Sequence, residues 1–326
     1  MHQDETVRVV SSPAAEGKRL PYQAIPDHLR AEIDRQLGSR VTEALTQPGG
    51  FSPGVAARLR LADGSRAFVK AVGDINPESP DIHRAEIRIA GALPPGTPAP
   101  KLRGSIDADG WVILLLEDID GLQPAQPWQP DELARVLAAM TELTTSLTPA
   151  PIEAPPAATR FEQIGTGWHS MATDHSGADD LSDVDPWIRR HLDNLVAAED
   201  KWSAAVQGRT LAHGDTRADN ILLTDDRVVF VDWPWACIGA PWFDLAAMLP
   251  SVAMQGGPPP DEVFTAHPLG READADRVTV VVGALAGVFT YLSRLPDPPG
   301  LPTLRAFQAA QAEVAVDWLK LRTGWR

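Results

Sequence analysis

Polar residues suited to phosphoryl transfer are concentrated in one short stretch, between His213 and Asp232. Asn220 directly precedes one predicted strand, and Asp232 follows the strand that pairs with it across a turn. This hairpin brings the two side chains together, where their oxygen atoms can hold one Mg²⁺. Asp215 lies on the loop that leads into the hairpin, where it can face an acceptor hydroxyl and take its proton. Phosphoryl transfer needs these parts, because it depends mainly on positioning and on neutralising charge.

The order and spacing of these residues resemble the catalytic and metal-binding motifs of the aminoglycoside phosphotransferase family, which also includes choline and homoserine kinases. The pattern is His213-x-Asp215-x-x-x-x-Asn220 followed by Asp232, and the later segment Asp244-Leu-Ala is similar to the family as well. The resemblance implies a protein-kinase-like fold, with Asp215 as the catalytic base and Asn220 and Asp232 as magnesium ligands. It also implies that His213 supports the catalytic loop and that Asp244 is an internal tie.

Three differences from eukaryotic protein kinases argue against a protein substrate. Asp232-Trp233-Pro234 replaces Asp-Phe-Gly, and Gly214 stands where those kinases have arginine. The sequence also lacks their Ala-Pro-Glu segment. We therefore expect a small-molecule acceptor.

Other interpretations of the same residues stay open at this point. Asp and Asn at loop ends commonly cap turns without any catalytic role. A metal hydrolase built on His213, Asp215 and Asp219 is a second alternative, although the further histidines that such a site usually needs are missing. A nucleotide-binding protein that has lost catalysis is a third. Its signature would be the loss of Lys70, Asp215 or Asp232, and all three are present.

The front half of the chain supplies a lysine and a glutamate that suit a nucleotide-binding cleft. Alternation along the predicted strand 66–72 places Lys70 on one face with Phe68 and Val72. On the following helix, Glu86 lies on the apolar stripe, from which it can reach Lys70. A lysine flanked by apolar residues usually needs an anion or a carboxylate partner. The alternative is an edge lysine with a solvated stem.

Two further segments are expected to contact the nucleotide. The glycine-rich loop 49–54 is predicted to lie over the ATP phosphates, with Gly50 offering its backbone and Ser52 its hydroxyl. A plain hairpin turn explains this loop equally well. Backbone groups near Glu117 and Ile119, after the buried strand 111–116, are expected to bind adenine at the hinge between lobes. The sequence does not separate ATP from GTP, but it contains no P-loop motif.

Arg217 lies two positions after Asp215, where protein kinases commonly have a lysine near the γ-phosphate. Two roles are open for its guanidinium. It either contributes to catalysis at the γ-phosphate or pairs with a local acid such as Asp219. The catalytic role predicts that Arg217→Ala lowers turnover more than it weakens ATP binding.

The charge of the chain is uneven and bears on its partners. The net charge is −15, of which residues 1–119 carry −2 and residues 120–326 carry −13. A nucleic-acid partner is disfavoured, because such a partner requires basic surface. Solubility explains an acidic half; the alternative is a site for a cationic acceptor, such as an aminoglycoside or another basic antibiotic. An amino-alcohol or a sugar metabolite is the other acceptor class that we consider.

An acidic run before the predicted helix at residue 186 has two readings as well. It is either a solvated helix start or part of a pocket for a cationic acceptor. The run consists of Asp179, Asp180, Asp183 and Asp185.

The whole chain of 326 residues predicts an α+β fold with two lobes of the protein-kinase-like type. Residues 1–118 form a small β-rich, nucleotide-binding lobe, in which residues 1–25 are a loose arm. Residues 119–326 form a larger, mostly helical lobe for catalysis and acceptor binding. Cys237 is the single cysteine, so no disulfide forms within the chain. We expect a cytoplasmic protein without a membrane partner, because no apolar run approaches the roughly 20 residues of a membrane span and the N-terminus lacks an apolar core. The oligomeric state is not predicted.

Overall fold

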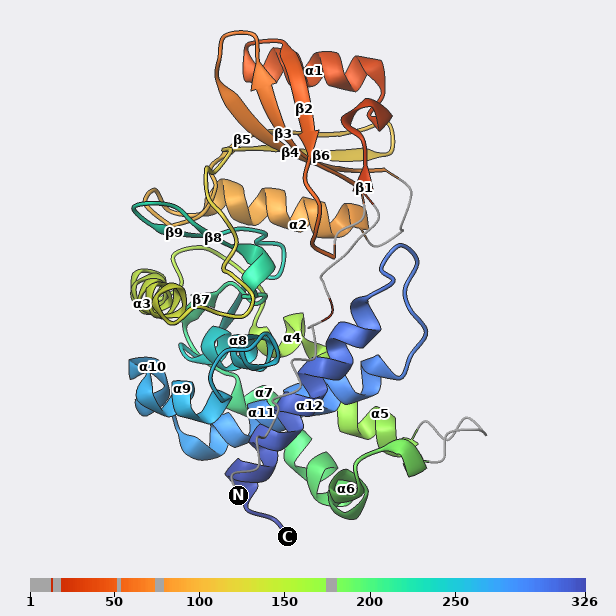
Figure 1. Ribbon diagram of the computed structural model, residues 1–326, viewed down its shortest axis with the longest axis vertical. Coiled ribbons are helices and arrows are strands. Elements are labelled where there is room, and N and C mark those ends of the chain that lie inside the picture. Colours follow the sequence, from red (N-terminus) through yellow and green to blue (C-terminus); the bar gives the residue numbers. More distant parts are fainter. Residues whose placement is uncertain (1–12, 14–18, 52–53, 74–78, 174–180) are drawn as a thin grey trace, which may run out of the picture.

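The computed structural model describes residue 13 and residues 19–51, 54–73, 79–173 and 181–326. A small lobe built on a β-sheet lies above a larger lobe made mostly of helices (Figure 1). This arrangement confirms the predicted α+β architecture of two unequal lobes. The lobes have separate hydrophobic cores, one around the sheet and one among the helices.

The small lobe contains a six-stranded sheet with the order β1-β3-β4-β6-β5, in which β2 also pairs with β3. All pairs are antiparallel except β1 with β3, which is parallel. β2, β3 and β4 form a three-stranded antiparallel meander within this sheet. The strands are β1 (Arg19–Leu20), β2 (Val41–Thr46), β3 (Gly54–Leu61), β4 (Arg66–Val72), β5 (Leu102–Ala108) and β6 (Trp111–Leu116).

One face of this sheet packs into the core of the small lobe, and the other faces the large lobe. Alternate apolar residues such as Leu59 and Val69 pack into the small-lobe core beneath α1 (Asp27–Leu37). The opposite face carries Arg58 and Lys70 toward the second lobe. There α2 (Ser79–Ala92) lies below the sheet, between it and the helical lobe (Figure 1). Strand alternation thus separates the side chains of the core from those of the cleft.

Two parts of the small lobe differ from the sequence-based expectation. Residues 19–25, expected in a loose arm, form β1 and a short 3-10 helix, and Tyr22 and Ile25 are buried. The rest of that arm lies outside the described residues, apart from residue 13. The strand β5 was not expected, because its large apolar side chains are limited to Leu102 and Ile106. A two-residue strand and an edge strand leave too little periodicity to be recognised.

The large lobe contains ten α-helices in its described residues and two short two-stranded sheets. One sheet pairs β7 (Thr210–Ala212) with β10 (Cys237–Gly239), and the other pairs β8 (Ile221–Leu223) with β9 (Val228–Phe230). The helices are α3 (Pro130–Ser146), α4 (Ala157–Arg160), α5 (Gly167–Thr173), α6 (Pro186–Glu199), α7 (Trp202–Ala205), α8 (Phe243–Met254), α9 (Pro260–Ala266), α10 (Pro268–Arg271), α11 (Ala275–Ser293) and α12 (Leu304–Thr323).

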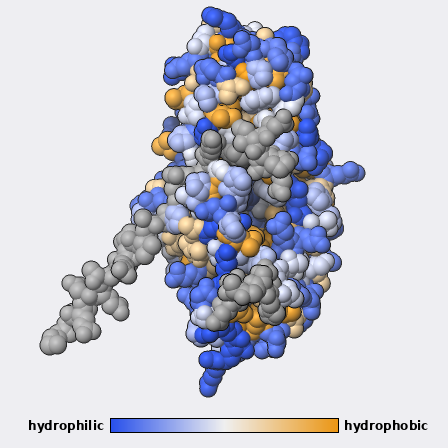
Figure 2. Space-filling model, turned by 90° about the vertical axis from the view of Figure 1, so that its right-hand side faces the viewer, coloured by the Kyte–Doolittle hydropathy of each residue, from blue (hydrophilic) through white to orange (hydrophobic). Residues whose placement is uncertain are grey.

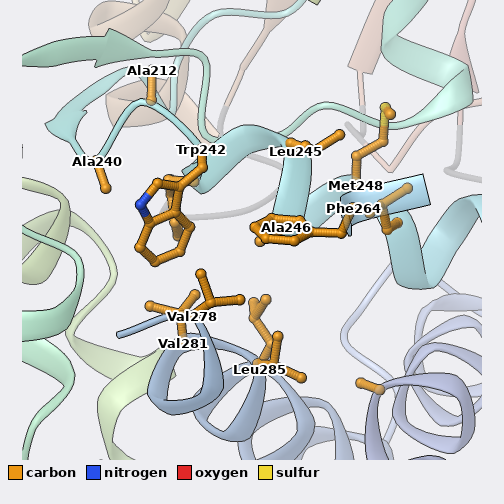
Figure 3. Packing of buried hydrophobic residues seen from close by; sticks show 14 of the residues in the cluster. Ala212, Ala240, Trp242, Leu245, Ala246, Met248, Phe264, Val278, Val281 and Leu285 are labelled. Atoms are coloured by element: carbon orange, nitrogen blue, oxygen red, sulfur yellow. The ribbon is translucent and has the colours of Figure 1, made fainter. Parts of the chain in front are cut away.

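The core of the large lobe is centred on α8. Its side chains belong to one cluster with those of α11 and α9, of which Figure 3 shows Leu245, Leu285 and Phe264. Because α8 is buried almost all round, its sequence has no amphipathic period, and the helix was not predicted. The helix predicted to begin at residue 186 is α6, and α7 follows it as a separate helix.

The helix α11 is long and apolar enough to cross a membrane by length and composition, and no other described helix is. This finding corrects the expectation from the sequence that no apolar run approaches the length of a membrane span. Half of its most apolar window is buried inside the protein, where α11 packs against α12 and α5. The face in Figure 2 is mostly hydrophilic, with apolar residues scattered over it. These features are those of a central helix in a folded core.

Candidate active site

The β8–β9 hairpin brings together the two residues expected to hold a metal ion. Asn220 directly precedes β8, and Asp232 follows β9 by two positions. The backbone N–H of Val231 donates to the carbonyl oxygen of Asn220 at 2.9 Å, which joins the two ends. Asp232 has a positive φ of 68°, a backbone conformation that non-glycine residues rarely adopt. The predicted convergence of Asn220 and Asp232 is therefore present in the fold.

His213 is fully buried beneath the loop that carries Asp215. Its Nε2–H donates to the carbonyl oxygen of Val231 at 2.9 Å, and its Nδ1 accepts from the backbone N–H of Asp215 at 3.2 Å. Burial lowers the pKa of His213, which favours the neutral ring that this pattern needs. The ring thus holds the loop against the β8–β9 hairpin, which we call the metal hairpin because it carries the two candidate metal ligands, Asn220 and Asp232.

Asp244, in the first turn of α8, ties the start of the same loop. Its carboxylate accepts from the backbone N–H of His213 at 2.7 Å and from that of Gly214 at 2.8 Å. Gly214 has φ of 83°, and a Cβ atom there would lie 2.4 Å from the carbonyl oxygen of Trp235. A residue with a side chain does not fit, so the loop requires glycine where protein kinases have arginine.

Asp215 is held from two sides. The amide of Asn220 donates to its Oδ2 at 3.0 Å and to its carbonyl oxygen at 2.9 Å, and Arg217 donates to its Oδ1. Burial raises the pKa of Asp215 to about 6, although the charge of Arg217 opposes the rise. A buried carboxylate with a raised pKa is a stronger proton acceptor than a solvated one.

Arg217 pairs with the local acid that the sequence suggested. Its guanidinium donates to both carboxylate oxygens of Asp219 at 3.0 Å, in addition to its bond with Asp215. Burial would lower its pKa, but the two carboxylates raise it. The ring of Phe51 in the glycine-rich loop lies 5.4 Å from the guanidinium and packs edge-to-face on Phe307 of α12. The two lobes therefore touch directly above Arg217.

Lys70 joins the two lobes through an ion pair with two carboxylates. Its Nζ lies 2.7 Å and 3.0 Å from the carboxylate oxygens of Glu86, as expected, and 3.0 Å from Oδ1 of Asp232. The side chains of Lys70 and Glu86 are 15% and 5% exposed. The sheet, α2 and the metal hairpin thus meet at one ammonium group.

The ammonium of Lys70 affects the pKa of Glu86 and the pKa of Asp232 differently. Burial raises the pKa of Glu86, and Lys70 offsets this only in part. Burial also acts to raise the pKa of Asp232, but Lys70 holds it below the usual value. Burial would lower the pKa of Lys70, and the two carboxylates raise it. Lys70 is therefore charged, and Asp232 is ionised and ready to accept a cation.

A cavity of about 620 Å³ lies between the lobes. Most of the predicted nucleotide and metal residues line it, namely Gly50, Lys70, Glu117, Ile119, Asn220 and Asp232. Glu86 does not line the cavity and contacts it through Lys70. Asp215 and Arg217 also lie outside the lining and reach it through Asn220 and Asp219. Ser52 lies outside the described residues.

The hinge offers one acceptor and one donor to this cavity. The N–H of Glu117 donates to the carbonyl oxygen of Lys101 at 2.9 Å. Within the described part of the chain, the carbonyl oxygen of Glu117 and the N–H of Ile119 have no hydrogen-bond partner. Both residues line the cavity, so these groups are free to pair with a base.

Three basic residues of the cavity lining were not predicted from the sequence. Arg19 of β1 lines the cavity and donates to the carbonyl oxygen of Gly49. Its position in the expected loose arm gave no signal. His83 of α2 and Arg58 of β3 line it as well. Leu59 faces the core, so strand alternation places its neighbour Arg58 on the opposite face. The position of Arg58 could therefore have been predicted from the sequence.

The donor set fits a magnesium ion. Asn220 uses its amide nitrogen toward Asp215, which leaves its side-chain oxygen for another contact. Asp232 adds an ionised carboxylate on the same cavity wall. Mg²⁺ is commonly bound by one or two such oxygens, with water and phosphate filling its other positions. No cluster of three His, Cys, Asp or Glu side chains that would suit a metal occurs in the described ranges, which agrees with such a sparse site.

The described part of the acidic run before α6, Asp183 and Asp185, is paired with basic side chains. Asp183 pairs with Arg294 at 2.6 Å. Asp185 caps α6 by accepting from the N–H of Trp187, and it also pairs with Lys320 at 2.6 Å. Asp179 and Asp180 lie outside the described residues. Asp183 and Asp185 also line a second cavity of about 550 Å³, together with Glu313 and Asp317 of α12. Both the structural reading and the cation-pocket reading of this run therefore stay open.

Comparisons with known proteins agree with this geometry. Residues 57–279 match the model of the phosphotransferase enzyme family. The chain is 28% identical over 122 residues to an aminoglycoside 3'-phosphotransferase of Streptomyces ribosidificus, a match covering 37% of this chain and 44% of that relative. The chain thus spans less than half of the curated relative it matches.

Solved structures share the fold over nearly the whole chain. A choline/ethanolamine kinase family protein from Mesorhizobium loti is 18% identical, with a TM-score of 0.58 over 91% of this chain and 94% of that one. The choline kinase LicA from Streptococcus pneumoniae is 14% identical, with a TM-score of 0.54 over 90% of this chain and 100% of that one. LicA has also been solved in complex with AMP, with a TM-score of 0.52 and 13% identity over 91% and 100% of the two chains. The family match covers well over half of the sequence, which confirms the resemblance seen in the motifs: this chain belongs to the phosphotransferase enzyme family.

Proposed function

We propose that this chain transfers the γ-phosphate of Mg-ATP to a hydroxyl group of a small-molecule acceptor. One observation carries the proposal: Lys70 contacts both Glu86 and Asp232 at the wall of a cavity of about 620 Å³. That cavity has an open acceptor and an open donor at its hinge, as an adenine base requires. The AMP complex of LicA, which shares the fold, supports nucleotide binding by a protein of this fold.

The residues around the cavity divide the work of the reaction. Lys70 binds the phosphates, and the backbone of Glu117 and Ile119 binds the base. The oxygen of the acceptor hydroxyl bonds to the γ-phosphorus, and Asp215 accepts the proton that this hydroxyl loses. The bond from that phosphorus to the β–γ bridging oxygen breaks, and ADP leaves with the electron pair. When bound at Asn220 and Asp232, Mg²⁺ supplies neutralisation of phosphate charge.

The acceptor that we favour is a cationic antibiotic such as an aminoglycoside. Two observations support it: the acidic residues 120–326, and the identity shared with an aminoglycoside 3'-phosphotransferase. An amino-alcohol or a sugar metabolite is the alternative, and two of the solved structures with the same fold are a choline kinase and a choline/ethanolamine kinase family protein. Their identity to this chain is below 25%, so they support the fold and leave the acceptor to experiment. We further propose that the reaction occurs in the cytoplasm, where ATP is abundant.

Two assays test the proposal in sequence. A thermal-shift titration with ATP, with and without Mg²⁺, tests for the nucleotide site without any acceptor. ADP release is then measured over a panel of aminoglycosides, amino-alcohols and sugars, with Asp215→Asn as the inactive control. Binding of Mg-ATP with turnover of a panel member, abolished in the variant, is the expected result. Binding without turnover across a broad panel would favour a protein that has lost catalysis, and no binding would refute the kinase assignment.

A further inference from the structure

Arg58 of β3 directs its guanidinium at the hinge. Its Nη2 donates to the carbonyl oxygen of Ile119 at 3.0 Å. Its Nε lies 3.4 Å from the carboxylate of Asp118, and its Nη1 lies 3.8 Å from that of Asp120. The donors of Arg58 are therefore turned toward the chain that links the lobes, while the residue lines the nucleotide cavity.

The carbonyl oxygen of Ile119 is saturated by this contact. It already accepts from the backbone N–H of Gly121 at 3.1 Å, and a carbonyl oxygen has two lone pairs. The hydrogen bond from Arg58 takes the second. The hinge is left with the open carbonyl of Glu117 and the open N–H of Ile119.

Adenine and guanine place opposite demands on such a hinge. Adenine presents an amino donor beside a ring-nitrogen acceptor, which matches the carbonyl of Glu117 and the N–H of Ile119. Guanine presents a carbonyl acceptor beside an N–H donor at the same edge. Guanine can use the N–H of Ile119 for its carbonyl, but its own N–H then needs the carbonyl of Ile119, which is already filled. A buried donor without a partner is costly.

The geometry points to Arg58 as the residue that selects adenine over guanine nucleotides, by occupying the hinge carbonyl of Ile119. This inference rests on the nucleotide site proposed above. It assigns Arg58 a role in donor specificity without contact with the reacting atoms. Two other roles compete with it: Arg58 could read guanine directly, or it could act only as a strut that stiffens the linker.

Arg66 of β4 provides a matched control for the competing role in which Arg58 only stiffens the linker between the lobes. It lies 3.3 Å from the carboxylate of Asp118 and 3.3 Å from that of Asp120, the same two acids that Arg58 faces. Its hydrogen bonds do not include the carbonyl of Ile119. Arg66→Met therefore loosens the same linker and removes the same charge, but it leaves the hinge carbonyl filled.

The test measures nucleotide binding, which needs no acceptor. Dissociation constants of non-hydrolysable ATP and GTP analogues are determined by calorimetry, with Mg²⁺, for the full-length wild type, Arg58→Met and Arg66→Met. For Arg58→Met we expect the affinity for the GTP analogue relative to the ATP analogue to rise about five- to tenfold, the range that one hydrogen bond supplies. For Arg66→Met we expect the ratio to stay at the wild-type value.

Three outcomes would overturn the inference. An unchanged ratio in Arg58→Met refutes selection through the carbonyl, and a fall in the ratio shows that Arg58 reads guanine directly. An equal rise in Arg66→Met assigns the effect to a loosened linker. If Arg58→Met fails to fold, Arg58→Met/Asp118→Asn removes the buried charge left behind and gives the same reading. Absence of ATP-analogue binding in the wild type would refute the proposed function instead, so the two failures are distinguishable.

Discussion

Two ion clusters in this active site follow the same plan but are assembled differently. In each, one cation lies between two carboxylates. Lys70 reaches Glu86, 16 residues away on α2, and Asp232, 162 residues away in the other lobe. Arg217 forms its ion pairs with aspartates that lie two positions before and after it in one loop. The first cluster is remote in sequence, and the second is local.

This difference predicts which measured quantity, nucleotide affinity or turnover, responds to a substitution in each cluster. The ion pairs of the local cluster lie within one loop that His213 and Asp244 hold inside the large lobe, and the small lobe reaches this cluster only through the ring of Phe51. The remote cluster exists only when sheet, α2 and metal hairpin approach one another. We therefore expect changes at the remote cluster to appear in nucleotide affinity and changes at the local cluster to appear in turnover.

Asp215→Asn gives the largest effect. The variant keeps the shape of the local cluster but removes the carboxylate that we propose takes the proton, so turnover should fall by about 100- to 10,000-fold. ATP affinity should change less than about threefold. Steady-state ADP release and calorimetry measure the two quantities. Asp219→Asn, which removes the same charge from the same loop, is the control and should lose far less turnover. Equal losses in both variants would show that charge alone matters.

Lys70→Met is the strongest test of the remote cluster. It removes a charged contact to the phosphates and leaves two carboxylates facing each other, so ATP affinity should fall about thirtyfold. Calorimetric titration measures the change, with the exposed Lys201→Met as control. An affinity like that of the wild type would place the phosphates away from Lys70.

Arg217→Ala tests whether the local cluster acts on chemistry. The change leaves Asp215 without its cation, and turnover should fall about tenfold or more while ATP affinity stays within about threefold. Arg217→Lys keeps the charge and should recover part of the lost turnover. A loss confined to ATP affinity would contradict the division between the clusters.

The smallest expected effect concerns the support of the local cluster. Cys237 is fully buried in β10, which pairs with β7 ahead of the catalytic loop, and burial raises the pKa of its thiol. Because the thiolate is the reactive form, labelling by a thiol reagent should be slow in the native state. Asp244→Asn, which loses a bond to the loop backbone, should speed labelling about fivefold.

The remote cluster provides the control for that measurement. Lys70→Met should leave the labelling rate of Cys237 near the wild-type value, because the support of the local cluster lies inside the large lobe. Faster labelling in this variant would show that the loop depends on the lobe interface after all.

Sequence patterns predicted the local cluster more completely than its surroundings. The spacing from His213 to Asp232 includes a hairpin, and a hairpin fixes its own register. Lys70 and Glu86 were paired correctly because strand and helix periodicities place each on a defined face. Arg19 was missed because two residues of strand carry no periodicity, and α8 was missed because a helix buried on all sides has no polar face.

The sequence by itself determined the candidate residues for the chemistry and their order: a proposed base, two proposed oxygen ligands, and a lysine with its glutamate. Only the tertiary structure decided that Lys70 also contacts Asp232, that Phe51 meets Phe307 above Arg217, and that Arg58 fills the carbonyl of Ile119. Periodicity and spacing act over a few residues along one element, whereas these contacts join elements of both lobes. Their geometry depends on how the two cores pack, which no local pattern encodes.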